Sequence, residues 1–366
     1  MLIFLLQFKT GIYNINVFET SSCKFAFFAG LSDDFSSAVT LKEVKILNKF
    51  FTIAKNTFTE TIRQPVYAVI IITALLLLFL SPSITMYTME DDNKLLRELG
   101  LSTLFLVGLF ISIFSASASV AEEIENKTIQ TVLSKPVRRP IFIIAKFFGV
   151  ICAVALAHYI CTIGVLMAIR HGVLESAGDT HDWTVIVAAA VSIVFVFLLS
   201  AFFNYSYDWK FTSTAVILLA VFATLSITFL FFIDRNWKFN PADNKINQLD
   251  VYGSVLLLLA AIIISAVAVT FSTRFNVAVI LSFCIGIFLL GLVTDYVFGR
   301  LAPGSLWARF FYYVIPNLQV FWIADGIYEG SRVSLNYVLM VAGYTTCYTV
   351  AVLSLATALF QRRQVG

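Results

Sequence analysis

Long apolar stretches separated by shorter polar segments run from residue 65 to residue 360 of the chain. Several windows of about 20 residues lack any charged side chain, and a helix of that length crosses a hydrocarbon core roughly 30 Å thick. A helix also satisfies its own backbone hydrogen bonds, as lipid requires. The pattern predicts eight spanning helices, at residues 65–87, 99–121, 141–168, 184–204, 212–233, 253–271, 276–297 and 336–360.

Composition supports the same interpretation, because 59% of the residues are hydrophobic and only 13% are charged. Soluble domains are far more polar. A transmembrane β-barrel would show alternating segments of about ten residues, and no such alternation is visible. The predicted fold class is therefore an all-α polytopic transmembrane helix bundle with about eight spans, or six as the alternative count.

The charged residues are distributed unequally between the two sets of loops that an even number of spans creates. One set holds 13 Lys and Arg against 6 Asp and Glu, in segments 41–64, 122–140, 205–211, 272–275 and 361–366. The other set holds 9 against 12, in segments 81–98, 170–183, 234–252 and 298–335. Cytoplasmic loops carry an excess of Lys and Arg. We therefore predict a multi-pass protein of the plasma (inner) membrane with both termini cytoplasmic.

The region before the first span divides into two parts. Residues 41–64 place apolar side chains at helical three- and four-residue steps, at Leu47, Phe50, Phe51, Ala54, Phe58 and Ile62. Such a helix can lie in the headgroup plane before Pro65 turns the chain into the bilayer; packing against a partner is the alternative. Residues 1–40 are expected to be a poorly ordered tail or an artefact of the start site, and residues 65–366 form the predicted transmembrane permease domain.

Segment 122–140 gathers charges between the second and third spans and favours a short amphipathic helix. Its carboxylates come first, with Glu123 four residues before Lys127, an order that stabilises a helix. Pro136 then ends the helix, and Arg138 and Arg139 lie near its C-terminal carbonyls. A basic anchor that only fixes the topology would look similar.

The residue order in this segment, E-x-E-x-x-T-I-x-x-x-L-S-x-P-V-x-R, resembles the cytoplasmic loop of type-2 ATP-binding-cassette exporter permeases. Similarity extends over about residues 45–366, and it includes the amphipathic helix before the first span. In that family the loop forms a coupling helix that docks into the ATPase subunit. The resemblance implies this role for the motif and its neighbours: Glu123, Glu125, Thr128, Ile129, Leu133, Pro136, Arg138 and Arg139.

The resemblance also implies a function and a set of partners. The chain would be the permease subunit that exports an unidentified substrate, with a second permease subunit as a homodimer or heterodimer, in the lipid membrane and without nucleic acid. It lacks the G-x-x-x-x-G-K-[ST] loop that binds nucleotide phosphates. We therefore expect no enzyme activity and no cofactor in this chain, with ATP and Mg²⁺ bound by a separate ATPase.

Two other functions compete with this interpretation: an ion-coupled secondary transporter and a non-transporting membrane scaffold. Ion coupling normally needs ionisable groups within the membrane. Away from their ends, seven of the eight spans contain no Asp, Glu, Lys, Arg or His. The third span has Lys146, close enough to an end to reach water, and His158, for which a hydrogen bond within the bundle is favoured over a role in proton transfer. Outside the spans, His171 and His181 lie near acidic residues, but their irregular spacing favours a solvated acidic loop over a metal site.

Overall fold

The computed structural model describes residues 47–85, 92–121, 123, 139–173, 180–241, 246–301, 303–324 and 333–361. The chain forms two units, residues 1–49 and residues 50–366. Of the first unit only residues 47–49 are described, and they are helical.

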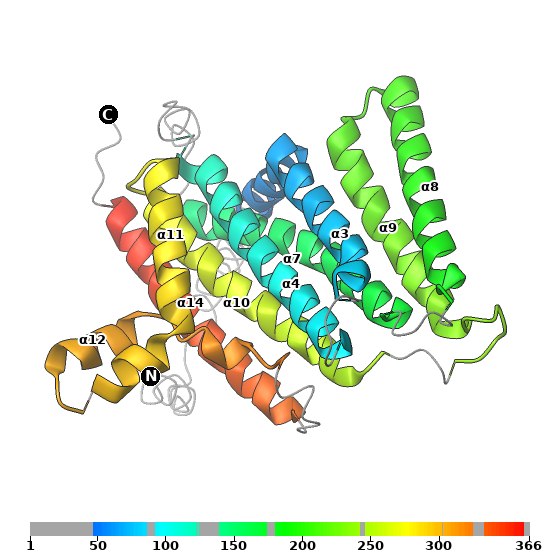
Figure 1. The fold of residues 1–366 in the computed structure, drawn as a ribbon. Coiled ribbons are helices and arrows are strands. Elements are labelled where there is room, and N and C mark those ends of the chain that lie inside the picture. The colour runs from blue at the N-terminus through cyan, green and yellow to red at the C-terminus, as the bar shows by residue number, and fades with distance from the viewer. Residues whose placement is uncertain are drawn as a thin grey trace, which may run out of the picture. The chain divides into compact units, whose positions relative to one another are not determined.

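Helices make up almost all of the described part of the second unit (Figure 1). The long helices are α3 (Pro65–Thr85), α4 (Asp92–Ala116), α7 (Arg139–His171), α8 (Trp183–Tyr207), α9 (Phe211–Phe232), α10 (Gln248–Ser272), α11 (Val277–Leu292) and α14 (Leu335–Gln361). The short elements are the π-helices η1 (Ser117–Ala121) and η2 (Asp295–Gly299), the α-helix α12 (Leu306–Val314) and the 3₁₀-helix η3 (Gln319–Phe321). Within the described ranges, seven helices are long and apolar enough to cross a membrane. The predicted all-α polytopic bundle is confirmed.

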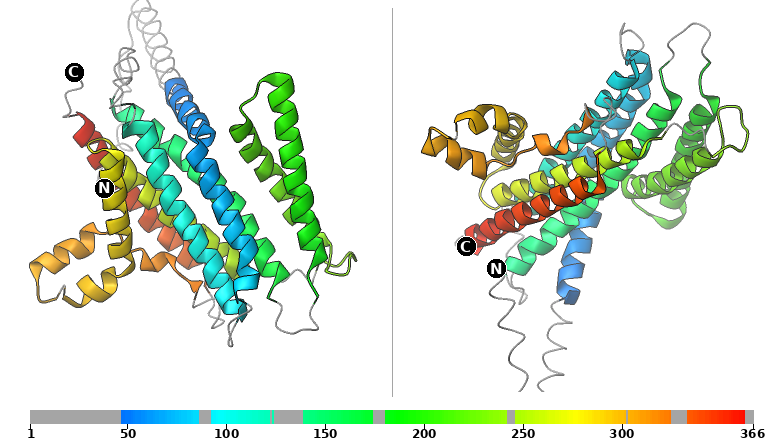
Figure 2. Two further views of the ribbon diagram at one scale, coloured as in Figure 1. Left: turned by 45° about the horizontal axis from the view of Figure 1, so that its top comes forward. Right: turned by 90° about the horizontal axis from the view of Figure 1, so that it is seen from below.

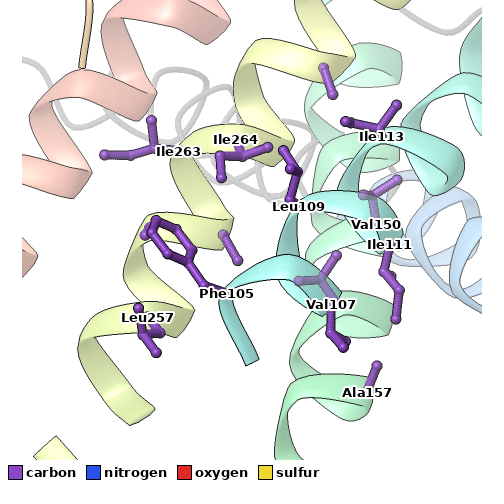
Figure 3. Packing of buried hydrophobic residues seen from close by; sticks show 14 of the residues in the cluster. Phe105, Val107, Leu109, Ile111, Ile113, Val150, Ala157, Leu257, Ile263 and Ile264 are labelled. Atoms are coloured by element: carbon purple, nitrogen blue, oxygen red, sulfur yellow. The ribbon is translucent and has the colours of Figure 1, made fainter. Parts of the chain in front are cut away.

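Helices α4, α7 and α10 form the centre of the bundle. The apolar stretch of the continuous helix Asn93–Ala121, which is α4 with η1, is 83% buried and that of α10 is 72% buried, whereas those of α3 and α14 are only 28% and 22% buried. Figure 3 shows α4 side chains between those of α7 and α10. Small residues allow the close approach of α4 and α10, because a Cβ atom at Gly108 would lie 2.9 Å from the Cβ atom of Ala261. The hydroxyl of Ser265 donates to that of Ser112 at 2.8 Å across the same contact.

The hairpin of α8 and α9 is fixed at one end by Arg170, the penultimate residue of α7. The Arg170 side chain is 3% exposed and lies 3.7 Å from the Asp182 carboxylate. Asp182 is also the N-cap of α8, where it accepts from the backbone N–H of Thr184. Arg170 donates in addition to the carbonyl of Ile233, directly after α9. A single guanidinium therefore joins the end of α7, the start of α8 and the end of α9.

Residues 50–63 form a helix that packs on α7. A Cβ atom at Gly149 would lie 2.6 Å from both the Ala54 carbonyl oxygen and the Thr57 Cβ. Thr57, Thr61 and Ile62 are buried, whereas Phe51 is 60% exposed. The buried face thus includes threonines that the apolar pattern did not include. An interfacial position for this helix stays a prediction.

The predicted span 276–297 is shorter in the structure, because α11 ends at Leu292. The chain then turns through η2 and returns, so that the backbone N–H of Leu318 donates to the carbonyl of Gly291 at 3.0 Å. Asp295 fixes the turn by accepting from the Tyr312 hydroxyl at 3.1 Å and from the Asn317 amide at 2.8 Å. The described residues of segment 293–324 therefore form a folded connection between α11 and the region before α14, and α11 is not a full span by itself.

Hydrogen bonds and ion pairs sort the helix ends into two groups. Arg139 and Arg274 both donate to carbonyls at the end of α14, at Gln361 and Leu359. At the other end of the bundle, Arg97 pairs with Asp250, and Arg170 joins α7, α8 and α9. These contacts connect loops that the charge count assigned to the same side. Arg274, just before α11, contacts the end of α14, whereas Val320 contacts Tyr337 near the start of α14. The stretch from α11 to Val320 therefore runs from one group of helix ends toward the other, and the shorter α11 leaves the grouping unchanged.

Candidate functional site

The candidate site is the connection between α4 and α7, and the structure describes only its two flanks. Glu123 and Arg139 are described, and each makes a specific contact with the bundle. The other predicted coupling residues lie outside the described residues: Glu125, Thr128, Ile129, Leu133, Pro136 and Arg138. Their roles in docking stay predictions.

The entry flank begins with the buried π-helix η1 at the end of α4. Two residues later the Glu123 carboxylate accepts from the Lys146 ammonium of α7 at 2.6 Å. The Lys146 side chain is only 3% exposed and its ammonium lies 5.6 Å from the centre of the Phe142 ring. Our expectation that Lys146 would reach water is wrong, because Glu123 is close enough to neutralise it inside the protein.

Burial and the neighbouring lysine act on Glu123 in opposite directions. Removal from water raises the pKa of the Glu123 carboxyl, since burial disfavours the charged form. The positive charge of Lys146 and its hydrogen bond lower that pKa, but burial is the larger effect. The site therefore contains a carboxylate whose charge depends on its lysine partner.

The exit flank is fixed to the last helix of the bundle. The Arg139 guanidinium donates to the Gln361 carbonyl at 2.9 Å, and that of Arg274 donates to the Leu359 carbonyl at 2.8 Å. The last four carbonyls of a helix have no intrahelical partners and carry partial negative charge, so arginines stabilise this end. Phe142 and Phe360 stack beside them with ring centres 6.0 Å apart.

The motif is visible in the sequence, but the partners of its flanks are not. Lys146 was visible as a charged residue in a span, which calls for a carboxylate nearby. Three glutamates, Glu122, Glu123 and Glu125, were available within four residues of each other, and nothing in the sequence selects Glu123. Arg274 and the end of α14 could be placed on the same side as Arg139, but only the fold brings them into contact.

His158 lies near the middle of α7 and is buried. Its Nε2 lies 2.9 Å from the Ser254 carbonyl and 3.1 Å from the Ser254 hydroxyl in α10. The Thr162 and Ser254 hydroxyls are 2.6 Å apart in the same cluster. The predicted hydrogen bond within the bundle is confirmed, and it joins α7 to α10.

The two other histidines flank the connection between α7 and α8. The ring centres of His171 and His181 are 5.6 Å apart. Asp182 is engaged with Arg170 and the start of α8, while Glu175 and Asp179 lie outside the described residues. The described part of the chain contains no group of three or more His, Cys, Asp or Glu residues that could hold a metal ion.

Comparison with known families gives one match, which covers most of the central bundle. Residues 68–275, from α3 to the end of the α10–α11 turn, match the family described as ABC-2 family transporter protein. Comparison with the curated proteins and with the solved structures gave no match. The matched region includes the α4–α7 connection and both of its anchored flanks, and it is more than half of the chain. The chain is therefore a multi-pass permease of an ABC transporter and belongs to the ABC-2 family.

Proposed function

We propose that this permease exports a substrate with energy from ATP hydrolysed by a separate ATPase subunit, which docks on segment 122–140. The observation that supports this proposal most directly is that both flanks of the segment are tied to helices. Glu123 joins the entry flank to α7, and Arg139 joins the exit flank to α14. A displacement of the docked segment would therefore move spanning helices.

The chain itself offers no nucleotide site of the P-loop type, since the motif that binds phosphates is absent from its sequence. ATP and Mg²⁺ would be bound by the partner. Members of the resembling family pair two permeases with two ATPases, so we propose a homodimer or a heterodimer with a second permease. ATP-driven closure of the ATPases would then act on two coupling segments as a rigid-body movement.

The proposed orientation places segment 122–140 and both termini in the cytoplasm, within the plasma (inner) membrane. The excess of Lys and Arg on that set of loops supports it. The contacts of Arg139 and Arg274 with the end of α14 bring three of those segments to one end of the bundle. An ATPase at that end would meet the coupling segment directly.

Leu133 provides the test of docking. If its side chain fills an apolar groove on the ATPase, Leu133→Asp places an unpaired carboxylate in the contact, at a cost of several kcal/mol, about 2–7 on transfer scales for polar groups. ATPase co-purification and transport-coupled ATP hydrolysis should then both fall by at least about tenfold.

The matched control is Leu133→Met, which keeps an apolar side chain of similar volume and should bind the ATPase normally. Membrane insertion and the elution position of the purified permease should be the same for both variants, because the substitution lies outside the spans. Normal ATPase binding and transport by Leu133→Asp would reduce segment 122–140 to a topology anchor and remove the main argument for this function.

A further inference from the structure

Helix α14 is held at one end by the elements that flank the coupling segment. Its carbonyls at Leu359 and Gln361 accept hydrogen bonds from Arg274 and Arg139. Phe360 is fully buried and stacks on Phe142, one turn beyond Arg139 in α7. Both a polar clamp and an apolar contact thus fix the last turn of α14 to the exit flank of segment 122–140.

Three tyrosines along the rest of α14 bind the backbone of segment 293–324. The Tyr337 hydroxyl donates to the Val320 carbonyl at 2.6 Å, and the Tyr348 hydroxyl donates to the Val314 carbonyl at 2.9 Å. Between them, the Tyr344 hydroxyl accepts from the backbone N–H of Asn317 at 3.1 Å. Each of these contacts is a hydrogen bond between a tyrosine hydroxyl of α14 and a backbone group of segment 293–324, so α14 fixes the main chain of that segment.

The helix between these two sets of contacts is continuous. Its 27 residues contain no proline and would extend about 40 Å at 1.5 Å per residue. It packs along α10, and Figure 2 shows the two helices side by side in both views. Tyr348 lies midway along α14, so segment 293–324 contacts the helix from its middle toward its N-terminal end.

We propose that α14 links the position of the coupling segment to segment 293–324. In this arrangement Arg139 and Arg274 are positioning residues at one end of the helix, and Tyr337, Tyr344 and Tyr348 are positioning residues toward the other. This link lies entirely within the permease and does not require the ATPase. Its use in transport rests on the proposed function, in which the ATPase moves segment 122–140.

Two conditions make such a link effective. First, the helix must be stiffer than the contacts at its ends. Helix α14 meets this condition because it is uninterrupted and packs along α10. The contacts must also have alternatives, because energetic coupling requires elements that can adopt two arrangements. In the proposed link, segment 293–324 is the part that changes arrangement, because its described residues form the short elements η2, α12 and η3 and not one long helix.

Amide hydrogen exchange of the purified permease in lipid nanodiscs tests the link without the ATPase. The double variant Arg139→Gln and Arg274→Gln removes the charged donors at one end while retaining polar side chains. If α14 transmits position, the backbone amides of residues 303–324, and that of Asn317 in particular, should exchange roughly tenfold faster than in the wild type. Local loosening should also appear in the last turn of α14.

Control variants separate transmission from general destabilisation. Lys210→Gln removes an exposed charge from the α8–α9 turn and should leave exchange at 303–324 unchanged. Arg139→Lys with Arg274→Lys keeps two cationic donors and should restore most of the protection. If the double Gln variant does not fold, Arg274→Gln alone leaves Arg139 in place and should give the same change at smaller size.

Loss of hydroxyls at the tyrosines provides a second measurement. Tyr344→Phe with Tyr348→Phe keeps the rings and should raise exchange at 314–320 directly. Adding the arginine substitutions to this background should give little further increase there, because the link is already broken. Exchange at 303–324 that stays at the wild-type rate in the arginine variants, while the last turn of α14 exchanges faster, would show that the clamp acts only locally and would overturn the proposal.

This outcome is independent of the docking test. If hydrogen exchange changes as expected but the Leu133→Asp variant still binds its ATPase, the link through α14 is supported and the proposed function is contradicted. If the ATPase docks through Leu133 but hydrogen exchange at residues 303–324 does not change, the proposed function is supported and the link is contradicted.

Discussion

The Glu123–Lys146 ion pair lies at the base of the coupling segment and is mostly shielded from water. Lys146→Met should destabilise the protein, because it removes the cation that the Glu123 carboxylate binds inside the protein, and breaking a buried ion pair costs about 3–5 kcal/mol. The expected effect is a lower thermal unfolding midpoint of the purified permease at pH 7.5. Glu123→Gln combined with Lys146→Met should cost less than Lys146→Met alone, since the double variant removes both charges of the pair.

The same pair predicts a pH dependence. Burial raises the pKa of Glu123, and removing the Lys146 charge should raise it further. Above the ordinary pKa of 4.5 and below the raised value, the folded state binds more protons than the unfolded state, so stability falls as pH rises. The deficit of Lys146→Met relative to the wild type should therefore shrink as pH is lowered from 7.5 to 5.

The double variant serves as the control, because it has no titrating carboxyl at position 123. Its unfolding midpoint relative to the wild type should change much less over this pH range than that of Lys146→Met. An equal pH dependence for the two variants would show that Glu123 does not carry the effect.

At the scale of single residues, the sequence predicted which residues make important contacts better than it predicted their hydrogen-bond partners. Glu123 and Arg139 were identified because a motif places them, and a hydrogen bond within the bundle was favoured for His158 over a role in proton transfer. The acceptors themselves, Gln361 for Arg139 and Ser254 for His158, are more than 90 residues away in the chain. Periodicity and local charge carry no information about such distant contacts.

At the scale of helices, the contact between residues 50–63 and α7 depends on Gly149. Gly149→Ala would place a Cβ atom 2.6 Å from the Ala54 carbonyl oxygen, so the backbone of one helix must shift. Overpacking of this kind typically costs about 1–3 kcal/mol, and we expect a lower thermal unfolding midpoint together with faster amide exchange in residues 50–63.

The control is Gly286→Ala in α11, where no atom lies within 4 Å of the added Cβ. Alanine is favoured over glycine within helices by about 1 kcal/mol, so this variant should be as stable as the wild type or more stable. Identical behaviour of the two variants would mean that residues 50–63 do not pack closely on α7.

Helix boundaries were predicted well where polar residues mark both ends. The predicted span 184–204 corresponds to Trp183–Tyr207, and the predicted span 336–360 corresponds to Leu335–Gln361. The prediction for 276–297 extended too far because the residues after Leu292 are mostly apolar. The chain turns there through tertiary contacts of Asp295 with Tyr312 and Asn317, and their spacing in the sequence does not predict a turn.

At the scale of the whole molecule, the proposed source of energy is ATP and not an ion gradient. Apart from His158, the described Asp, Glu, Lys, Arg and His residues within the spans lie near helix ends or in ion pairs, as with Lys146 and Arg97. Liposomes that contain the permease together with its ATPase should move substrate only when ATP is supplied. Liposomes with the permease alone should not accumulate that substrate on a proton or sodium gradient.

An outcome opposite to this one has a specific interpretation. Gradient-driven transport by the permease alone would favour an ion-coupled carrier, and His158 would then be the first residue to substitute. His158→Gln keeps a hydrogen-bonding side chain but cannot carry a proton near neutral pH. For the ATP-driven complex, this variant should retain transport and its pH profile.

The last prediction concerns the orientation of the molecule in the membrane. Contacts between helix ends group the loops into two sets, so that a single accessible position in each set orients the entire bundle. The positive-inside rule assigns the set containing segment 122–140 to the cytoplasm. In a variant whose five cysteines have been replaced, a cysteine at Asn126 should react with a membrane-impermeant maleimide only after permeabilisation.

A cysteine at Asp243 serves as the matched opposite, because it lies in the loop between α9 and α10. It should react with the same reagent in intact cells. The reverse pattern would place segment 122–140 outside, where no ATP is available to a docked ATPase. That result would exclude the proposed coupling role for Glu123, Leu133 and Arg139, while the contacts that hold the flanks of the segment to α7 and α14 would remain as purely structural features of the bundle.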